Sequence, residues 1–270
     1  MQRLECNRLQ FAAIIAANSI GILMLYIMPL IVGAIADAFS ISEGDAGAIE
    51  GYEITAMAIA GILTAIYLKR LNSHALVMSC ITLFITGTLL TVYFLHSLNE
   101  IGFVLSRLLT GFSTGALFAI SNAAAAQTPN PTKTFSIMAG FEVAISVIGT
   151  LGVSTTVGMY GPAGAFYFVA IIGLILLPFM FFFPSLLDSE DLDLDNTVTV
   201  SPINKYSMLS LLGFFFIIAG TNVLWPFTER IGESLSISIE SIGYILTLGA
   251  AVSFAGPILC SLFTVRIGFL

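Results

Sequence analysis

The chain has 270 residues, of which 57% are hydrophobic and only 9% are charged, and its mean hydropathy is +1.01. Because soluble domains carry about a quarter charged residues, this composition excludes an ordinary water-soluble fold and predicts a membrane protein. The net charge of -7 is largely local, since five of the sixteen acidic residues lie between Asp188 and Asp195, and there is no basic patch for nucleic acid.

Eight apolar runs follow one another along the chain, and each is long enough for a membrane-spanning helix of about 20 residues. The first run is too long for the apolar region of a secretory signal and lacks a cleavage-like end, so it predicts a first spanning helix. The predicted spans are 9–35, 45–68, 75–95, 101–126, 134–159, 163–184, 207–229 and 240–264.

The basic residues set the predicted orientation, because cytoplasmic loops of membrane proteins carry an excess of Lys and Arg. If the N-terminus is cytoplasmic, seven of the nine basic residues fall on the cytoplasmic side: Arg3, Arg8, Lys69, Arg70, Lys133, Lys205 and Arg266. This bias predicts a multi-pass protein of the inner (cytoplasmic) membrane. The polar, Asp-rich segment 185–206 then forms a cytoplasmic linker between the sixth and seventh spans.

The last two spans resemble the first two in sequence. The features Phe39-Ser-Ile-Ser42, Gly47 and Arg70 recur as Leu235-Ser-Ile-Ser238, Gly243 and Arg266, each displaced by 196 residues. Because the order and the spacing hold across a whole helical hairpin, spans seven and eight are interpreted as a second copy of spans one and two.

Six spans, a cytoplasmic linker and a second set that begins like the first resemble the major facilitator superfamily of secondary transporters. The resemblance implies an all-helical membrane bundle with a complete six-helix first half at 1–184 and an acidic linker at 185–206. Residues 207–270 would then be the first two helices of a second, incomplete bundle. Either further C-terminal helices or a second chain would complete that bundle.

Span four carries a charge that needs an explanation. Arg107 lies inside an apolar run, where a cation costs about 2.5–3.5 kcal/mol on insertion scales and normally has a carboxylate nearby. Gly111 and Gly115 follow at intervals of four, so they share a helix face and allow a neighbouring helix to approach closely. These three residues are similar to an Arg-x-x-x-Gly-x-x-x-Gly pattern of the family, whose arginine is implicated in proton coupling in its drug/proton antiporters.

The partner expected for Arg107 is a glutamate of span two. With a rise of 1.5 Å per residue, Glu50 and Glu53 lie about 7 and 12 Å deep from the outer side, and Arg107 lies about 9 Å deep. The sequence therefore predicts that Glu53, or as the second choice Glu50, pairs with Arg107 and releases it when the glutamate takes up a proton. A pair that serves only assembly is the alternative.

A basic loop follows span two and recurs after span eight. By resemblance, Lys69 and Arg70 in the first copy, and Arg266 and Gly268 in the second, correspond to the family's cytoplasmic loop motif. Both copies lack the aspartate of that motif. The basic residues still suit a surface of anionic lipids.

Glu142, in span five, is the other acid inside an apolar run. Two roles are open for it, a proton site or a structural acid that hydrogen-bonds to Asn18 or Asn122. By resemblance to the family, whose first helix of each half lines the cavity, the candidate solute-contact residues are Asn18, Tyr26, Asn122, Asn222 and Trp225. The alternative for Trp225 is a place in the interfacial aromatic belt.

The sequence contains no pattern typical of an enzyme active site. The two histidines lie at span ends and the three cysteines lie far apart, so neither a metal site nor a catalytic triad is predicted, and no cofactor is expected. The predicted function is secondary transport of a small organic solute by alternating access, coupled to protons and directed to efflux rather than uptake. The alternative is a membrane-embedded binding or scaffold protein, or an inactive fragment, without transport.

Overall fold

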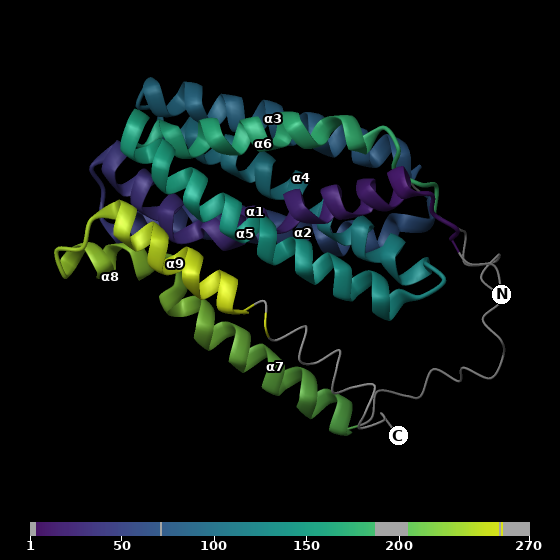
Figure 1. The fold of residues 1–270 in the computed structure, drawn as a ribbon. Coiled ribbons are helices and arrows are strands. Elements are labelled where there is room, and N and C mark those ends of the chain that lie inside the picture. Colours follow the sequence, from purple (N-terminus) through teal and green to yellow (C-terminus); the bar gives the residue numbers. More distant parts are fainter. Residues whose placement is uncertain (1–3, 71, 187–204, 254, 256–270) are drawn as a thin grey trace.

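The computed structural model describes residues 4–70, 72–186, 205–253 and 255. Within these ranges the chain is helical and contains no β-strand (Figure 1). Six helices are long and apolar enough to cross a membrane. They are α1 (Arg8–Phe39), α2 (Glu43–Tyr67), α3 (Ser73–His96), α4 (Glu100–Gln127), α5 (Pro131–Tyr160) and α6 (Ala163–Met180).

The first five of these helices begin at a polar capping residue. The caps are Asn7, Ser42, Asn72, Asn99 and Asn130, and the side chain of each accepts a hydrogen bond from the backbone N–H three residues later. Such a cap satisfies one of the backbone donors that a helix leaves unpaired at its start. The helix starts therefore follow from local sequence, and all six helices overlap their predicted spans.

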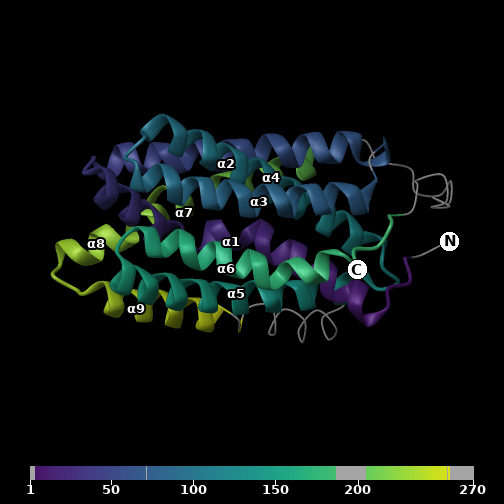
Figure 2. The same ribbon diagram turned by 90° about the horizontal axis from the view of Figure 1, so that it is seen from above.

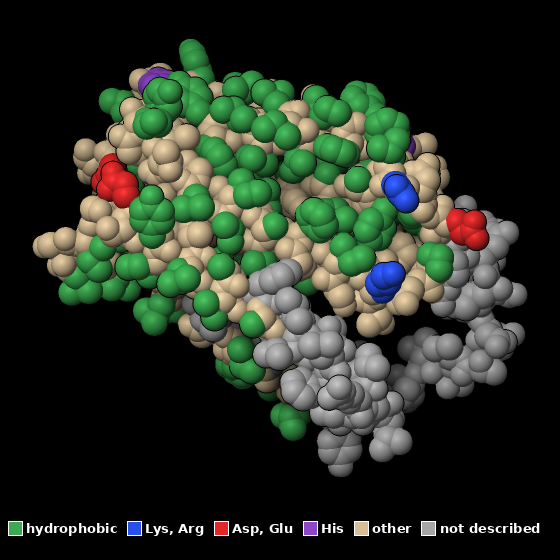
Figure 3. Space-filling model, viewed as in Figure 1, with side chains coloured by type: hydrophobic (Ala, Val, Ile, Leu, Met, Phe, Trp, Pro, Cys, Tyr) green, Lys and Arg blue, Asp and Glu red, His purple; other side chains and the backbone are tan. Residues whose placement is uncertain are grey.

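Helix α1 is the centre of the bundle. It packs against α2 and α4 on one side and against α5 and α6 on the other, while α3 packs against α4 and α6 (Figure 2). Many large hydrophobic side chains of the described residues are exposed, and the face in Figure 3 shows them spread over the bundle. A helical protein that is apolar both inside and outside fits a lipid surrounding, because every backbone polar group is satisfied within its own helix.

The segment after the linker is less regular than predicted. Helix α7 (Lys205–Leu224) ends before a 3₁₀ turn η2 (Trp225–Phe227), which leads into α8 (Thr228–Ser234). The span predicted over 207–229 is therefore interrupted at Trp225–Phe227, because Pro226 lacks a backbone N–H and its ring prevents the helix from continuing regularly. In Figure 1, α7 diverges from the six-helix bundle.

Helix α9 (Ile239–Ser253) occupies the start of the predicted span 240–264, and residues 256–264 of that span lie outside the described residues. It packs along α5 (Figure 2).

The two copies of the internal repeat share local geometry. Ser40 and Ser236, which are 196 residues apart, both have positive φ, at 53° and 61°. Two residues later, the hydroxyl groups of Ser42 and Ser238 accept hydrogen bonds from the backbone N–H of Asp45 and Ser241, 3.1 and 3.4 Å away. The same turn therefore leads into α2 and into α9.

Candidate functional site

The contact between α2 and α4 depends on two glycines. A Cβ atom at Gly111 would collide with the backbone oxygen of Glu53, and one at Gly115 would collide with the backbone oxygen of Met57. Both glycines therefore bring α4 directly against the backbone of α2, as the spacing of four residues predicts.

Arg107 is fully buried at this contact and faces two carboxylates. Its Nη2 lies 3.1 Å from Oε2 and 3.3 Å from Oε1 of Glu50, and it also contacts Oε2 of Glu53. Glu50 and Glu53 are 1% and 2% exposed. Because residues three apart share a helix face, α2 presents both acids to one guanidinium. The sequence offered these glutamates as alternatives, and the structure joins both to Arg107.

Two further side chains complete the surroundings of Arg107. Thr110 Oγ1 lies 3.0 Å from Glu53 Oε1 and 2.8 Å from the backbone oxygen of Arg107. The ring of Phe166 on α6 lies 5.2 Å from Arg107 Cζ. Thr110 follows Arg107 by three residues, so helix spacing could have placed it on the same face as Arg107. Nothing in the sequence indicated Phe166.

The charges of this buried cluster do not balance. One guanidinium faces two carboxylates, so the cluster carries a formal charge of -1 when all three groups are ionised. A buried charge without a partner is costly in a protein interior. One additional proton on either carboxylate would make the cluster neutral.

A second polar cluster lies between α1, α4 and α5. Asn18 Nδ2 donates to Glu142 Oε1 at 2.7 Å, and the hydroxyl of Tyr26 donates to Glu142 Oε2 at 3.4 Å. Asn122 Nδ2 and Ser121 Oγ donate to Asn18 Oδ1 at 3.3 and 3.4 Å. Asn18 and Tyr26 therefore contact the Glu142 carboxylate, while Ser121 and Asn122 contact Asn18. Of these side chains, only Ser121 was not singled out from the sequence.

A cavity of about 390 Å³ lies between α1, α2 and α4. It is lined by residues of α1, α2 and α4, including Leu25, Phe118 and Gly115. The side chains of the second polar cluster do not line this cavity, and its walls are apolar.

The segment after the linker contacts α1 at two levels. Trp225 Nε1 donates to the backbone oxygen of Leu25 at 2.9 Å. Near the end of α1, Arg230 donates to the backbone oxygen of Gly33 at 2.5 Å and to Asp37 at 2.7 Å. Arg230 also binds Glu233 at 2.5 Å, and its Nε lies 3.9 Å from the buried Glu229.

The other predicted site residues contribute less to this picture. Arg70 is exposed at the end of the 3₁₀ turn η1 (Leu68–Arg70). The side chains of Lys69 and Asn222, and the residues Arg266 and Gly268, lie outside what the structure describes. Within the described ranges, no group of three or more His, Cys, Asp or Glu residues is arranged to hold a metal ion.

The protein-family model described as Major Facilitator Superfamily matches residues 11–269 of the chain. No curated protein matches the chain.

Proposed function

This chain belongs to the major facilitator superfamily, and on that premise we propose that it is a proton-coupled secondary transporter that moves a small organic solute out of the cytoplasm by alternating access. We further propose that residues 1–184 form its first six-helix bundle, 185–206 a cytoplasmic linker and 207–270 the opening helices of its second bundle. In this proposal it lies in the inner membrane with its N-terminus in the cytoplasm.

The observation that carries the proposal is the buried cluster of Arg107 with Glu50 and Glu53. A structural ion pair needs only one carboxylate for one guanidinium. The second carboxylate leaves room for a proton, and a proton that enters or leaves from one side of the membrane is the coupling event that an antiporter requires.

We assign the proton to Glu53 because of Thr110. When Glu53 is ionised, the Thr110 hydroxyl can donate to it. When Glu53 is protonated, its own O–H can donate to Thr110 Oγ1, while Thr110 donates to the backbone oxygen of Arg107 2.8 Å away. Glu53 therefore keeps a hydrogen-bond partner in both protonation states, and Arg107 stays paired with Glu50.

Protonation of Glu53 would act on the contact between α2 and α4. It removes one of the two carboxylates that hold Arg107, at the position where Gly111 packs against the backbone of Glu53. Loss of this attraction lets α2 shift against α4 at a glycine contact that side chains do not fill. The cluster around Glu142 is the proposed contact surface for the solute.

The test is coupled flux in proteoliposomes that contain a pH-sensitive dye. The panel consists of small neutral and cationic amphiphiles, because the proposed contact surface offers a carboxylate and amide groups between otherwise apolar helices. Addition of a transported solute should move protons in the opposite direction, and Glu53→Gln should abolish this proton movement while solute counterflow continues. Glu43→Gln is the matched control, since Glu43 is an exposed acid on the same helix and should behave as the original protein.

Two results would contradict the proposal. Full proton-coupled flux in Glu53→Gln would remove the assigned proton site. Absence of counterflow for every solute that binds, with no change on neutralising Glu53, would favour a membrane-embedded binding or scaffold protein.

Orientation has a separate test. A membrane-impermeant thiol reagent applied to intact cells should label Ser97→Cys, which is exposed after α3, and should not label Arg70→Cys, which is exposed before α3. The opposite pattern would reverse the proposed topology.

A further inference from the structure

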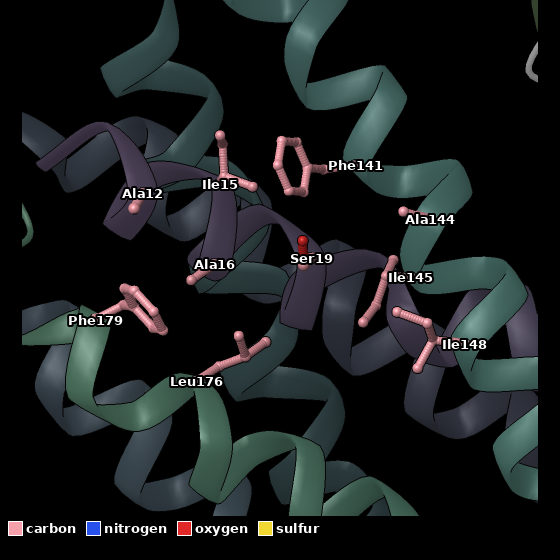
Figure 4. A pocket seen from close by; sticks show the side chains of 10 residues that line it. All are labelled: Ala12, Ile15, Ala16, Ser19, Phe141, Ala144, Ile145, Ile148, Leu176 and Phe179. Atoms are coloured by element: carbon pink, nitrogen blue, oxygen red, sulfur yellow. The ribbon is translucent and has the colours of Figure 1, made fainter. Parts of the chain in front are cut away.

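An apolar groove runs between α1, α5 and α6, and no side chain of the two polar clusters lines it (Figure 4). Its volume is about 290 Å³, and its walls include Ala16 of α1, Phe141 of α5 and Phe179 of α6. Figure 4 shows these side chains facing a common space, with Ser19 as the one polar side chain among those that line it.

The groove opens on the outer surface of the bundle. Phe141 and Ile148 are each 50% exposed. Helix α9 approaches α5 on the opposite side, where Thr150 Oγ1 lies 2.9 Å from Thr247 Oγ1 and Ser154 contacts Gly243. Thr150 follows Ile148 by two residues, which turns a helix by about 200°. The described part of α9 therefore leaves the groove uncovered.

Two basic residues stand on the helix faces that lead into the groove. Arg8 precedes Ala12 by four residues and Ser19 by eleven, and Lys133 precedes Phe141 by eight and Ala144 by eleven, spacings that return to one face of a helix. Both side chains are exposed, and neither forms an ion pair in the described part of the chain. Figure 3 shows basic side chains over the end of the molecule where α1 and α5 begin.

We propose that this groove binds one anionic phospholipid, with an acyl chain between α1, α5 and α6 and the phosphate between Arg8 and Lys133. The groove lies in the half of the membrane nearest those two residues, because Ala12 is about 6 Å and Phe141 about 12 Å from them along their helices at 1.5 Å per residue. An acyl chain gains little by leaving one apolar surrounding for another. Selectivity therefore comes from the two cations, and it favours an anionic headgroup.

The occupant is identified by photochemical capture. Phe141 is replaced by p-azidophenylalanine, which keeps the aromatic ring, and the chain is reconstituted in vesicles of one part phosphatidylglycerol to nine parts phosphatidylcholine. After illumination, the mass of the adduct should be that of one phosphatidylglycerol, enriched well above its share of the bilayer. The same replacement at Leu83 is the control, since Leu83 is exposed and lies ten residues into α3, as Phe141 lies ten residues into α5. It should capture the two lipids in proportion to the bilayer.

Charge removal tests the headgroup contact. Each basic residue near an anionic surface is worth about fivefold in binding, so Arg8→Gln with Lys133→Gln should remove most of an enrichment on the order of 25-fold. Arg70→Gln, which removes an exposed cation outside the groove, should leave the enrichment unchanged. Both variants change exposed side chains only, and monodisperse elution from a sizing column confirms folding.

Three outcomes would overturn the proposal. Capture of the lipids in their bulk ratio at Phe141 would show ordinary surrounding lipid only. A cross-linked pair of chains would show that a second copy covers the groove. A cross-link within one chain without lipid would show that another segment of the chain covers it.

Discussion

Gly111 of α4 lies directly against the backbone oxygen of Glu53 of α2, so the close approach of the two helices and the proposed proton site share one residue. The carboxylate of Glu53 contacts Arg107, while its backbone forms the surface on which α4 packs. A change in the charge of this side chain is therefore transmitted to the helix contact without any intervening residue.

The first prediction concerns this contact. Gly111→Ala places a Cβ against the backbone of Glu53, which cannot move aside as a side chain could. Overpacking of this kind costs about 1–3 kcal/mol, so we expect a lower melting temperature in detergent micelles. Gly51→Ala on α2 is the control, because nothing lies within 4 Å of its added Cβ. Alanine there should leave stability unchanged or raise it by up to about 1 kcal/mol. Equal melting temperatures for the two variants would argue against a tight contact at Gly111.

The second prediction concerns the buried charges. Arg107→Met leaves Glu50 and Glu53 buried together without a cation, and removal of one partner from a buried pair costs about 3–5 kcal/mol. The same substitution combined with Glu50→Gln and Glu53→Gln leaves no charge in the cluster, so the triple variant should regain much of the lost stability. Chemical denaturation in micelles measures both. If the triple variant is no more stable than Arg107→Met, the carboxylates are not unpaired in the single variant.

The third prediction separates charge from hydrogen bonding at Glu142. Glu142→Gln retains an oxygen to accept from Asn18, and its amide can donate to the Tyr26 hydroxyl, so the melting temperature should change little. Glu142→Ala removes both contacts and should cost about 1–3 kcal/mol, because the buried Asn18 amide loses its acceptor. Proton-coupled flux decides the role of Glu142. Loss of coupling in Glu142→Gln assigns a proton site, whereas normal coupling leaves a structural acid.

The fourth prediction concerns the contact of α8 with α1. Arg230→Gln removes donors from Gly33 and Asp37 and leaves the buried Glu229 without its nearest cation. We expect a loss of about 1–3 kcal/mol. Asp37→Asn should cost no more than about 1 kcal/mol, since the Asp37 side chain is 53% exposed. Thermal unfolding of the two variants side by side measures the difference, and an equal loss in both would assign the contact to the Asp37 ion pair alone.

The local parts of the fold could be read from the sequence. Spanning helices need only a run of about 20 apolar residues, and their starts need a side chain such as Asn99 or Asn130 that can cap the first turn. The need of Arg107 for a carboxylate was equally predictable, because an isolated cation is costly inside a membrane. Depth along straight helices restricted its partner to two glutamates of the second span.

The choice between those glutamates could not be made from depth alone. A rise of 1.5 Å per residue places Glu50 and Glu53 on either side of Arg107, and only the rotation of α2 about its axis decides which of them faces α4. In the structure α2 is rotated so that both glutamates face the guanidinium of Arg107, and both carboxylates contact it. The contact between Asp37 and Arg230 could not be predicted for the same reason, because the two residues are 193 positions apart and meet only through the packing of their helices.

By itself, then, the sequence determined the six helices long and apolar enough to span a membrane, roughly where they begin and which charges need partners, because these properties depend on the local run of residues. Only the tertiary structure decided that one arginine faces two acids, that Phe166 lies beside it, and that an apolar groove opens between α1, α5 and α6. Those features depend on how separate helices are rotated and stacked against each other, and the side chains that fix this packing are apolar and similar in all six.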